Sequence, residues 1–134
     1  MPSNRAPTAP LHKAVIAGDI ATVRKYLSSK RIKVNHLSNG RTALSYAVSH
    51  NNYQLAKLLL EAGAIPDTPA KSTGLSPIHI ASNKGDLNMV KLLVEYGANT
   101  QLQGRSPNNT WTPISAASKN NHTKVVEFLT KPYD

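Results

Sequence analysis

Residues 74–99 read GLSPIHIASNKGDLNMVKLLVEYGAN. A serine and a proline that suit the start of a helix are followed by a short apolar run, a Gly-Asp break, a second apolar run and a closing glycine. The stretch therefore predicts two short helices joined by a tight turn. Two helices of this size cannot bury their own apolar faces, so the pair must pack against other parts of the chain.

The same pattern recurs along the whole sequence. The segment SPIHIA at 76–81 has relatives APLHKA at 9–14, TALSYA at 42–47 and TPISAA at 112–117. The final alanines of successive copies are 33, 34 and 36 residues apart. A period of this size is typical of a repeat protein, in which each helix pair packs on the next and all pairs share one continuous core.

The residues at the expected helix boundaries agree between the copies. Thr42, Ser76 and Thr112 are candidate N-caps, whereas the first copy has Ala9 at this place. Nine residues after each cap position stands a residue type that tolerates the left-handed backbone ending a helix: Gly18, Asn51, Gly85 and Asn121. Second helices are then predicted over residues 20–29, 53–62, 87–96 and 123–131.

These motifs, together with LLLEAGA at 58–64 and LLVEYGAN at 92–99, resemble those of the ankyrin repeat family. The resemblance implies an all-α fold, an ankyrin-repeat solenoid of four helix-turn-helix units with β-turn fingers. The expected organisation is an N-terminal arm over 1–8, a capping repeat over 9–41, a repeat over 42–75, a repeat with a long finger over 76–111, and a second capping repeat over 112–134.

Composition excludes several classes of function. The chain has no cysteine, so it contains no disulfide and no thiolate metal site. Its start carries no apolar run of the kind that marks a secretion signal, and no segment approaches membrane-spanning length. His36, His50 and His122 have no second ligand at metal-binding spacing, and no nucleophile or phosphate-loop motif is present. We therefore expect no enzyme activity, no cofactor and no metal.

His12 and His79 occupy equivalent positions in the first and third copies. In the family that the motifs resemble, a histidine at this position is structural and bonds backbone in the neighbouring finger. Ser45 and Ser115 stand there in the other two copies and can also form hydrogen bonds. A structural role is accordingly the expected one for both histidines.

The resemblance also indicates where a partner would bind. In ankyrin-like stacks the finger tips and the inner face of the first helices line a concave surface. The residues at matching positions are Arg41, Ser49, His50, Leu75, Asn83, Lys84, Trp111, Lys119 and Asn120. Trp111 is the single tryptophan and is either a binding hot spot or a packing residue for the long finger. The expected partner is another protein of acidic character, bound by a monomer in the cytoplasm or nucleus.

A basic segment offers an alternative. Sixteen Lys and Arg against seven Asp and Glu give a formal net charge of +9. Part of this excess lies close together in the sequence, at Arg24, Lys25, Lys30, Arg31 and Lys33. The segment could bind nucleic acid or an anionic membrane, act as a nuclear-import signal, or be a solvated helix end. Aromatic residues for base stacking are scarce nearby, so sequence-specific nucleic-acid binding is not expected. The chain could also be the interaction domain of a larger effector protein.

Overall fold

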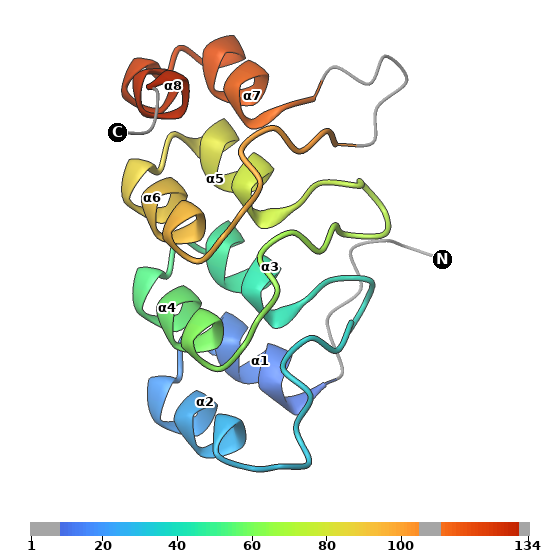
Figure 1. Cartoon of the computed structure of the whole chain (residues 1–134). Coiled ribbons are helices and arrows are strands. Elements are labelled where there is room, and N and C mark those ends of the chain that lie inside the picture. The colour runs from blue at the N-terminus through green and yellow to red at the C-terminus, as the bar shows by residue number, and fades with distance from the viewer. Residues whose placement is uncertain (1–8, 105–110, 132–134) are drawn as a thin grey trace.

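The computed structural model describes residues 9–104 and 111–131, and over these residues it contains helices and no named strand. The helices are α1 (Pro10–Ala17), α2 (Ile20–Leu27), α3 (Ala43–Ser49), α4 (Tyr53–Glu61), α5 (Pro77–Lys84), α6 (Leu87–Glu95), α7 (Pro113–Lys119) and α8 (Thr123–Thr130). They form four helix pairs stacked in chain order, as the sequence predicts (Figure 1).

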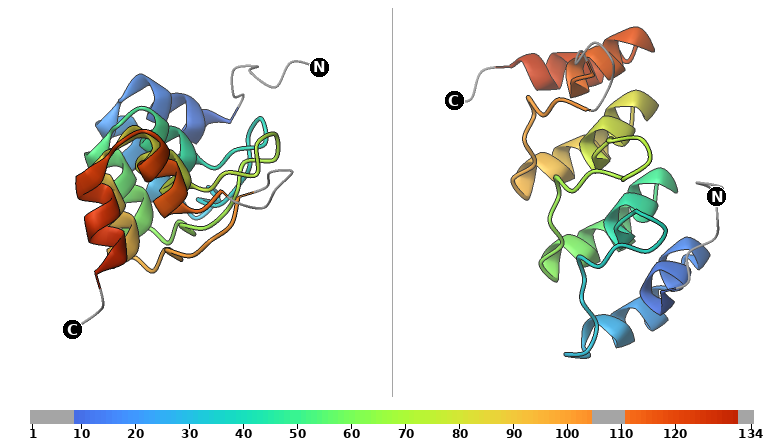
Figure 2. Two further views of the ribbon diagram at one scale, coloured as in Figure 1. Left: turned by 90° about the horizontal axis from the view of Figure 1, so that it is seen from above. Right: turned by 90° about the vertical axis from the view of Figure 1, so that its right-hand side faces the viewer.

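The pairs build a two-layered stack. Helices α1, α3, α5 and α7 follow one another in an inner layer, and α2, α4, α6 and α8 follow one another in an outer layer (Figure 1). The connections from each outer helix to the next inner helix project to one side as fingers, which extend to the right of the helices in the left panel of Figure 2 and point toward the viewer in its right panel. The layout is that of a solenoid, with each pair packed mainly on its neighbours.

Side-chain caps begin most of the helices. The Thr42 hydroxyl accepts a hydrogen bond from the Ser45 N–H at 3.1 Å, and the Thr112 hydroxyl accepts one from the Ser115 N–H at 3.2 Å. Asp19, Asn52 and Asp86 cap the outer helices α2, α4 and α6 in the same way. At Ala9, by contrast, α1 has no side-chain cap.

The turns between paired helices are left-handed, as predicted. Their φ angles are 71° at Gly18, 56° at Asn51, 76° at Gly85 and 61° at Asn121. Glycine and asparagine adopt this conformation at the lowest cost, so these four residues let each outer helix fold back beside its inner helix.

The outer helices are one or two residues shorter than the sequence predicts. They end at Leu27, Glu61, Glu95 and Thr130 rather than at 29, 62, 96 and 131. Ala62 and Tyr96, for example, are C-cap residues with ψ of 3° and 17°, after which Gly63 and Gly97 turn the chain at positive φ. Both C-cap residues are nonpolar or aromatic and stand where the periodic pattern continues, so periodicity does not fix the last helical residue.

The core runs unbroken through the stack. Leu44, Leu55, Ile78 and Leu93 are fully buried, and each contributes roughly 1.5–3 kcal/mol through burial of its apolar surface. The repeat alanines Ala47, Ala81 and Ala117 are likewise inaccessible to solvent. Their small side chains let neighbouring inner helices approach closely.

Equivalent polar contacts join successive repeats along the base of the fingers. The Asn35 side chain donates to the Gly63 carbonyl at 3.2 Å and accepts from the Ile65 N–H at 2.7 Å. One repeat later, the Asp67 carboxylate accepts from the Asn99 N–H at 3.1 Å. Each contact ties the end of one repeat to the end of the next.

The first finger is a tight hairpin. Ser38 and Arg41 form an antiparallel bridge around Asn39 and Gly40, whose φ angles are 57° and 76°. An Asn-Gly pair with two positive φ angles is the preferred two-residue hairpin turn. The Lys71 N–H of the second finger donates to the Gly40 carbonyl at 2.9 Å, so the two fingers are held side by side.

The long finger expected over 99–111 is described only in part. Gly104 and Trp111 form an antiparallel bridge at its base, and residues 105–110 lie outside the described part of the chain. The arm over 1–8 and the last residues, 132–134, also lie outside it. Among the described helices, none has the length and hydrophobicity needed to span a membrane.

Candidate functional site

The two repeat histidines fasten fingers to inner helices. His79 Nδ1 accepts the Ser76 N–H at 3.1 Å, which leaves the proton on Nε2. Nε2 then donates to the carbonyls of Leu102 and Trp111, at 2.8 and 3.2 Å. His79 is only 1% exposed. The third finger is therefore anchored at its base, directly beside the tryptophan.

His12 makes the matching contacts in the first repeat. Its Nε2 lies 3.0 Å from the His36 carbonyl and 3.1 Å from the Arg41 carbonyl. Burial lowers the pKa of both His12 and His79 below the ordinary histidine value, so both rings are neutral at pH 7. The described residues contain no group of three or more side chains able to hold a metal ion. Both imidazoles thus contact two backbone carbonyls of a finger.

The first finger carries Arg41, which is bound to α3, the inner helix of the second repeat. Its guanidinium donates to the Ser45 hydroxyl at 3.0 Å, to the Ser45 carbonyl at 3.0 Å, and to the Ser49 hydroxyl. It also lies 4.3 Å from the centroid of the Tyr46 ring. Burial lowers the pKa of Arg41, although the group stays charged at neutral pH. Arg41 is half-buried.

The second and third repeats meet at Lys84. Its ammonium group donates to the Ser49 carbonyl at 2.7 Å and so connects α5 to α3. The Ser49 side chain and backbone thus join Arg41 to Lys84. His50, at the end of α3, is exposed, and its Nδ1 lies 2.8 Å from the Tyr46 carbonyl.

The third and fourth repeats meet at Asn83. The Asn120 side-chain amide donates to the Asn83 side-chain oxygen at 2.6 Å and to its carbonyl at 3.1 Å. His122 Nε2 lies 2.9 Å from the same carbonyl. These contacts occur one repeat further along than the Ser49–Lys84 contact and bridge the matching helix ends.

Trp111 lies at the base of the third finger, half-buried. The Lys119 ammonium group is 5.3 Å from the centroid of its ring. Leu75 and Trp111 both pack close to Gly104, where an added Cβ would lie 2.9 Å from Leu75 Cδ2 and 3.3 Å from Trp111 Cβ. Leu75 and Trp111 therefore both border the space that a side chain at position 104 would need.

The residues proposed from the sequence thus fall into three linked groups, which together we name the finger–helix surface. The groups are Arg41, Ser49 and Lys84; Asn83 and Asn120; and Leu75, Trp111 and Lys119, with His50 exposed beside the first. Sequence reasoning missed the contributions of Tyr46 and His122. Periodicity alone carried no signal for either, since Tyr46 reads as core and His122 as a turn residue.

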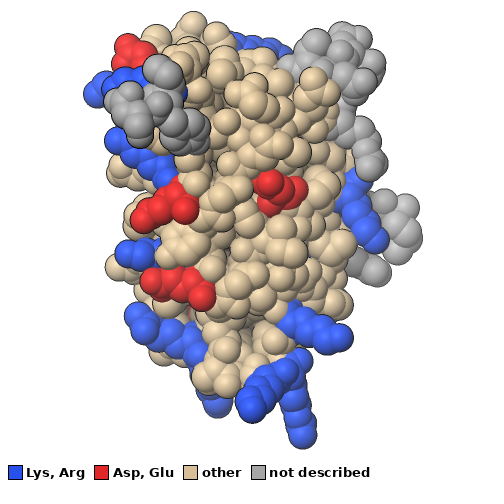
Figure 3. Space-filling view, in the orientation of Figure 1, with Lys and Arg blue, Asp and Glu red and all other residues tan. Residues whose placement is uncertain are grey.

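The basic residues lie elsewhere. Arg24 and Lys25 are in the last turn of α2, and Lys30, Arg31 and Lys33 are in the segment that follows; all five are exposed. In Figure 3, Lys and Arg gather at the α2 end of the displayed face, whereas Asp and Glu lie further along the stack. Part of the positive charge is therefore concentrated at the first-repeat end.

Comparison with known proteins agrees with this architecture. A family model described as ankyrin repeats (3 copies) matches residues 3–72 and 65–134. An ankyrin repeat protein of Acanthamoeba polyphaga mimivirus is 31% identical over 123 residues, which cover 92% of this chain and 16% of that protein. A second, from fowlpox virus, is 30% identical over 118 residues, covering 87% of this chain and 19% of the viral protein.

Similarity extends to a shorter relative. Cyclin-dependent kinase inhibitor 2A of Monodelphis domestica is 33% identical over 92 residues, which cover 67% of this chain and 50% of the inhibitor. The chain spans less than a fifth of the length of the two viral relatives.

Proposed function

The chain belongs to the ankyrin repeat family, and from this we propose that it binds a partner protein through the finger–helix surface. Ankyrin repeats are in general protein–protein interaction modules. The observation that carries the proposal is the network of contacts between the surface residues themselves. Arg41 bonds Ser49, Ser49 bonds Lys84, and Lys119 lies over Trp111.

Such a network favours binding because the side chains are ordered before the partner arrives. Immobilising a long side chain at an interface costs about 0.5–1.5 kcal/mol. Arg41 and Lys84 are already held by hydrogen bonds within the chain, so much of that cost is met on folding. The fingers are also fixed, through His12 and His79.

The chemistry of the surface favours an acidic partner. Arg41, Lys84 and Lys119 supply three cations, and no Asp or Glu is among the residues of the finger–helix surface. Trp111 and Leu75 add an apolar area at one end. A partner segment with carboxylates along its length and an apolar residue near Trp111 fits this arrangement. An adaptor, an inhibitor or a targeting factor would each use such a contact.

The test is capture of the partner on immobilised full chain, with wild type beside Trp111→Ala. Tyr53→Ala is the matched control, since Tyr53 is an aromatic residue 42% exposed on the outer helix α4. Circular dichroism first establishes that all three proteins fold. We expect a protein retained by wild type and by Tyr53→Ala and lost from Trp111→Ala. Equal retention by all three would rule out Trp111 as a contact.

The concentration of charge at the α2 end favours a second candidate, an electrostatic binder of nucleic acid or anionic membrane. Such binding weakens steeply as salt is raised, because counterions are released from the anion. Reversal of Lys30, Arg31 and Lys33 to Glu should then abolish binding to a single-stranded oligonucleotide or to phosphatidylserine vesicles. Binding that is insensitive to salt and lost with Trp111→Ala would exclude this candidate.

A further inference from the structure

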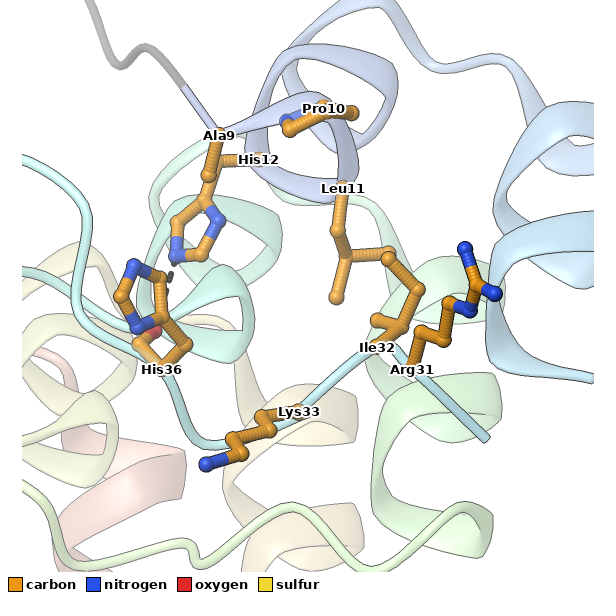
Figure 4. Close-up of a pocket in the computed structure, with 8 residues that line it drawn as sticks. All are labelled: Ala9, Pro10, Leu11, His12, Arg31, Ile32, Lys33 and His36. Carbon is orange, nitrogen blue, oxygen red and sulfur yellow. Dashed lines mark hydrogen bonds between the residues drawn. The ribbon is translucent and has the colours of Figure 1, made fainter. Parts of the chain in front are cut away.

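A pocket of about 340 Å³ opens at the first-repeat end of the stack, away from the finger–helix surface. One wall is the start of α1, and the other is the segment that follows α2 (Figure 4). The lining residues are Ala9, Pro10, Leu11, His12, Arg31, Ile32, Lys33 and His36. The pocket therefore joins the basic segment to the first helix of the chain.

The start of α1 is suited to an anion. Ala9 provides no side-chain acceptor, whereas Thr42 and Thr112 cap the matching helices α3 and α7. The first N–H groups of a helix have no partner within the helix, and the helix dipole makes this end electropositive. A carboxylate in the pocket would fill the role that threonine fills in the other repeats.

His12 gives a second and independent indication of a ligand. It is 1% exposed, and its Nδ1 is buried without a hydrogen-bond partner among the described residues. In the third repeat the equivalent atom, His79 Nδ1, accepts the Ser76 N–H. In the first repeat the corresponding N–H, that of Ala9, instead donates to the Ser38 hydroxyl at 3.2 Å.

The protonation of the His12 ring determines which kind of hydrogen-bonding group Nδ1 can contact. His12 Nε2 faces two carbonyls, which only accept, so it carries the proton and Nδ1 carries a lone pair. Nδ1 lies on the side of the ring away from the contact with His36 (Figure 4). A ligand must therefore bring a hydrogen-bond donor to this atom as well as an acceptor to the start of α1.

The remaining walls supply charge and apolar surface. Arg31 and Lys33 are exposed and stand on either side of Ile32, and none of the described residues that line the pocket is acidic (Figure 4). Leu11 and Ile32 form an apolar patch between the charged groups. The complement is a ligand that combines carboxylates with an aliphatic side chain.

We propose that this pocket binds an acidic peptide segment of a partner protein. A side-chain carboxylate of the segment caps α1 and pairs with Arg31 or Lys33, an aliphatic side chain lies against Ile32, and a peptide N–H donates to His12 Nδ1. A phosphodiester backbone offers acceptors but no such donor, so it fits less well than a peptide. The pocket shares no lining residue with the finger–helix surface, although His12 contacts the Arg41 carbonyl, and the proposal does not depend on the function proposed for that surface.

The experiment selects peptides on the folded full-length chain. A displayed library of random twelve-residue peptides is enriched on wild type and depleted on the double variant Arg31→Glu/Lys33→Glu. We expect the enriched peptides to place Asp or Glu next to Leu, Ile or Val. A synthetic peptide of that sequence should bind the double variant at least about tenfold more weakly than wild type, the loss expected for one charged hydrogen bond.

The matched control is Arg24→Glu/Lys25→Glu, which makes the same change in charge within the basic segment but outside the pocket. This variant and Trp111→Ala should bind the peptide nearly as well as wild type. An equal loss in both charge-reversal variants would overturn the proposal in favour of unspecific attraction. Loss in Trp111→Ala alone would overturn it by moving the peptide to the finger–helix surface.

A spectroscopic measurement addresses the atom directly, since replacing His12 could unfold the chain. The ¹⁵N chemical shift of His12 Nδ1 should move on addition of the peptide, as a lone pair accepts a hydrogen bond, while that of His79 Nδ1 should not. An unchanged His12 signal with saturating peptide would refute the assignment. The same change on raising protein concentration without peptide would assign the pocket to a second copy of the chain and also overturn the proposal.

Discussion

The ammonium group of Lys119 lies 5.3 Å from the centroid of the Trp111 ring. The lysine ends α7, and the tryptophan directly precedes the cap residue of the same helix. The pair therefore closes the end of the finger–helix surface with a cation and an aromatic face in contact. It also orients the only tryptophan of the chain.

Replacement of Lys119 by Gln should lower the free energy of unfolding by about 0.5–1 kcal/mol, the contribution of an exposed cation–π contact. It should also shift the fluorescence of Trp111, which is the only source of tryptophan emission. Lys124→Gln, on the exposed face of α8, is the control and should change neither quantity. An emission spectrum of Lys119→Gln identical to those of Lys124→Gln and wild type would contradict a Lys119–Trp111 contact in solution.

The buried histidines should make stability depend on pH. Burial lowers the pKa of His12 and His79 in the folded chain below the ordinary histidine value. At a pH between these two pKa values, the unfolded chain therefore binds more protons than the folded chain. The free energy of unfolding is then at its full value above about pH 6.5 and falls as the pH is lowered through the folded values. Urea unfolding between pH 7.5 and 5 measures this slope.

The control for the pH effect is the double variant His12→Ser/His79→Ser, which uses the residue found at this position in the other repeats. It should be less stable at pH 7.5 by roughly 1–3 kcal/mol for each unsatisfied contact. Its stability should change less between pH 7.5 and 5 than that of wild type. A slope as steep as the wild-type one would assign the pH dependence to other groups.

Two glycines with positive φ should respond differently to alanine. A Cβ at Gly85 would overlap the imidazole of His122, whereas a Cβ at Gly63 would meet nothing within 4 Å. Gly63→Ala should therefore cost only the left-handed strain, about 1–2 kcal/mol. Gly85→Ala should cost more, because His122 must move and lose its contact with the Asn83 carbonyl. Thermal unfolding measures both, and equal losses would show that His122 moves freely.

The missing cap of α1 should be correctable. Ala9 has the extended backbone of an N-cap, with φ of −69° and ψ of 135°. Ala9→Asp should raise the free energy of unfolding by about 0.5–2 kcal/mol, and Thr42→Ala should lower it by a similar amount. Chemical denaturation compares the two. Ala9→Asp should also weaken binding of the acidic peptide, because its own carboxylate occupies the start of α1.

The helices and their boundaries were largely predictable because they depend on local chemistry. Thr42 and Thr112 form caps, and Gly18 and Asn51 adopt left-handed conformations, for reasons that each copy of the repeat displays in sequence. The last residue of each outer helix was not predictable. Tyr96, for example, still packs against the core although α6 has ended at Glu95.

The details of the finger–helix surface depend on contacts between repeats, which periodicity does not encode. The sequence placed Arg41 on this surface, but not its bonds to Ser45 and Ser49. The pocket beside His12 was also beyond prediction. Ala9 was visible as a missing cap, yet only the fold shows that Arg31 and Lys33 lie across from it.

The polar contacts at the base of the fingers have a consequence for how such a chain can lengthen. Asn35 is bonded to Gly63 and Ile65, and Asp67 to Asn99, so each contact joins one unit to the unit that follows. A duplicated copy of the unit over 42–75, inserted in phase, would present the same donors and acceptors to both of its new neighbours. The molecule can therefore gain length by duplication of a single unit, with the added junction bringing Asp67 of one copy to the Ile65 N–H of the next, two groups that existing junctions already use.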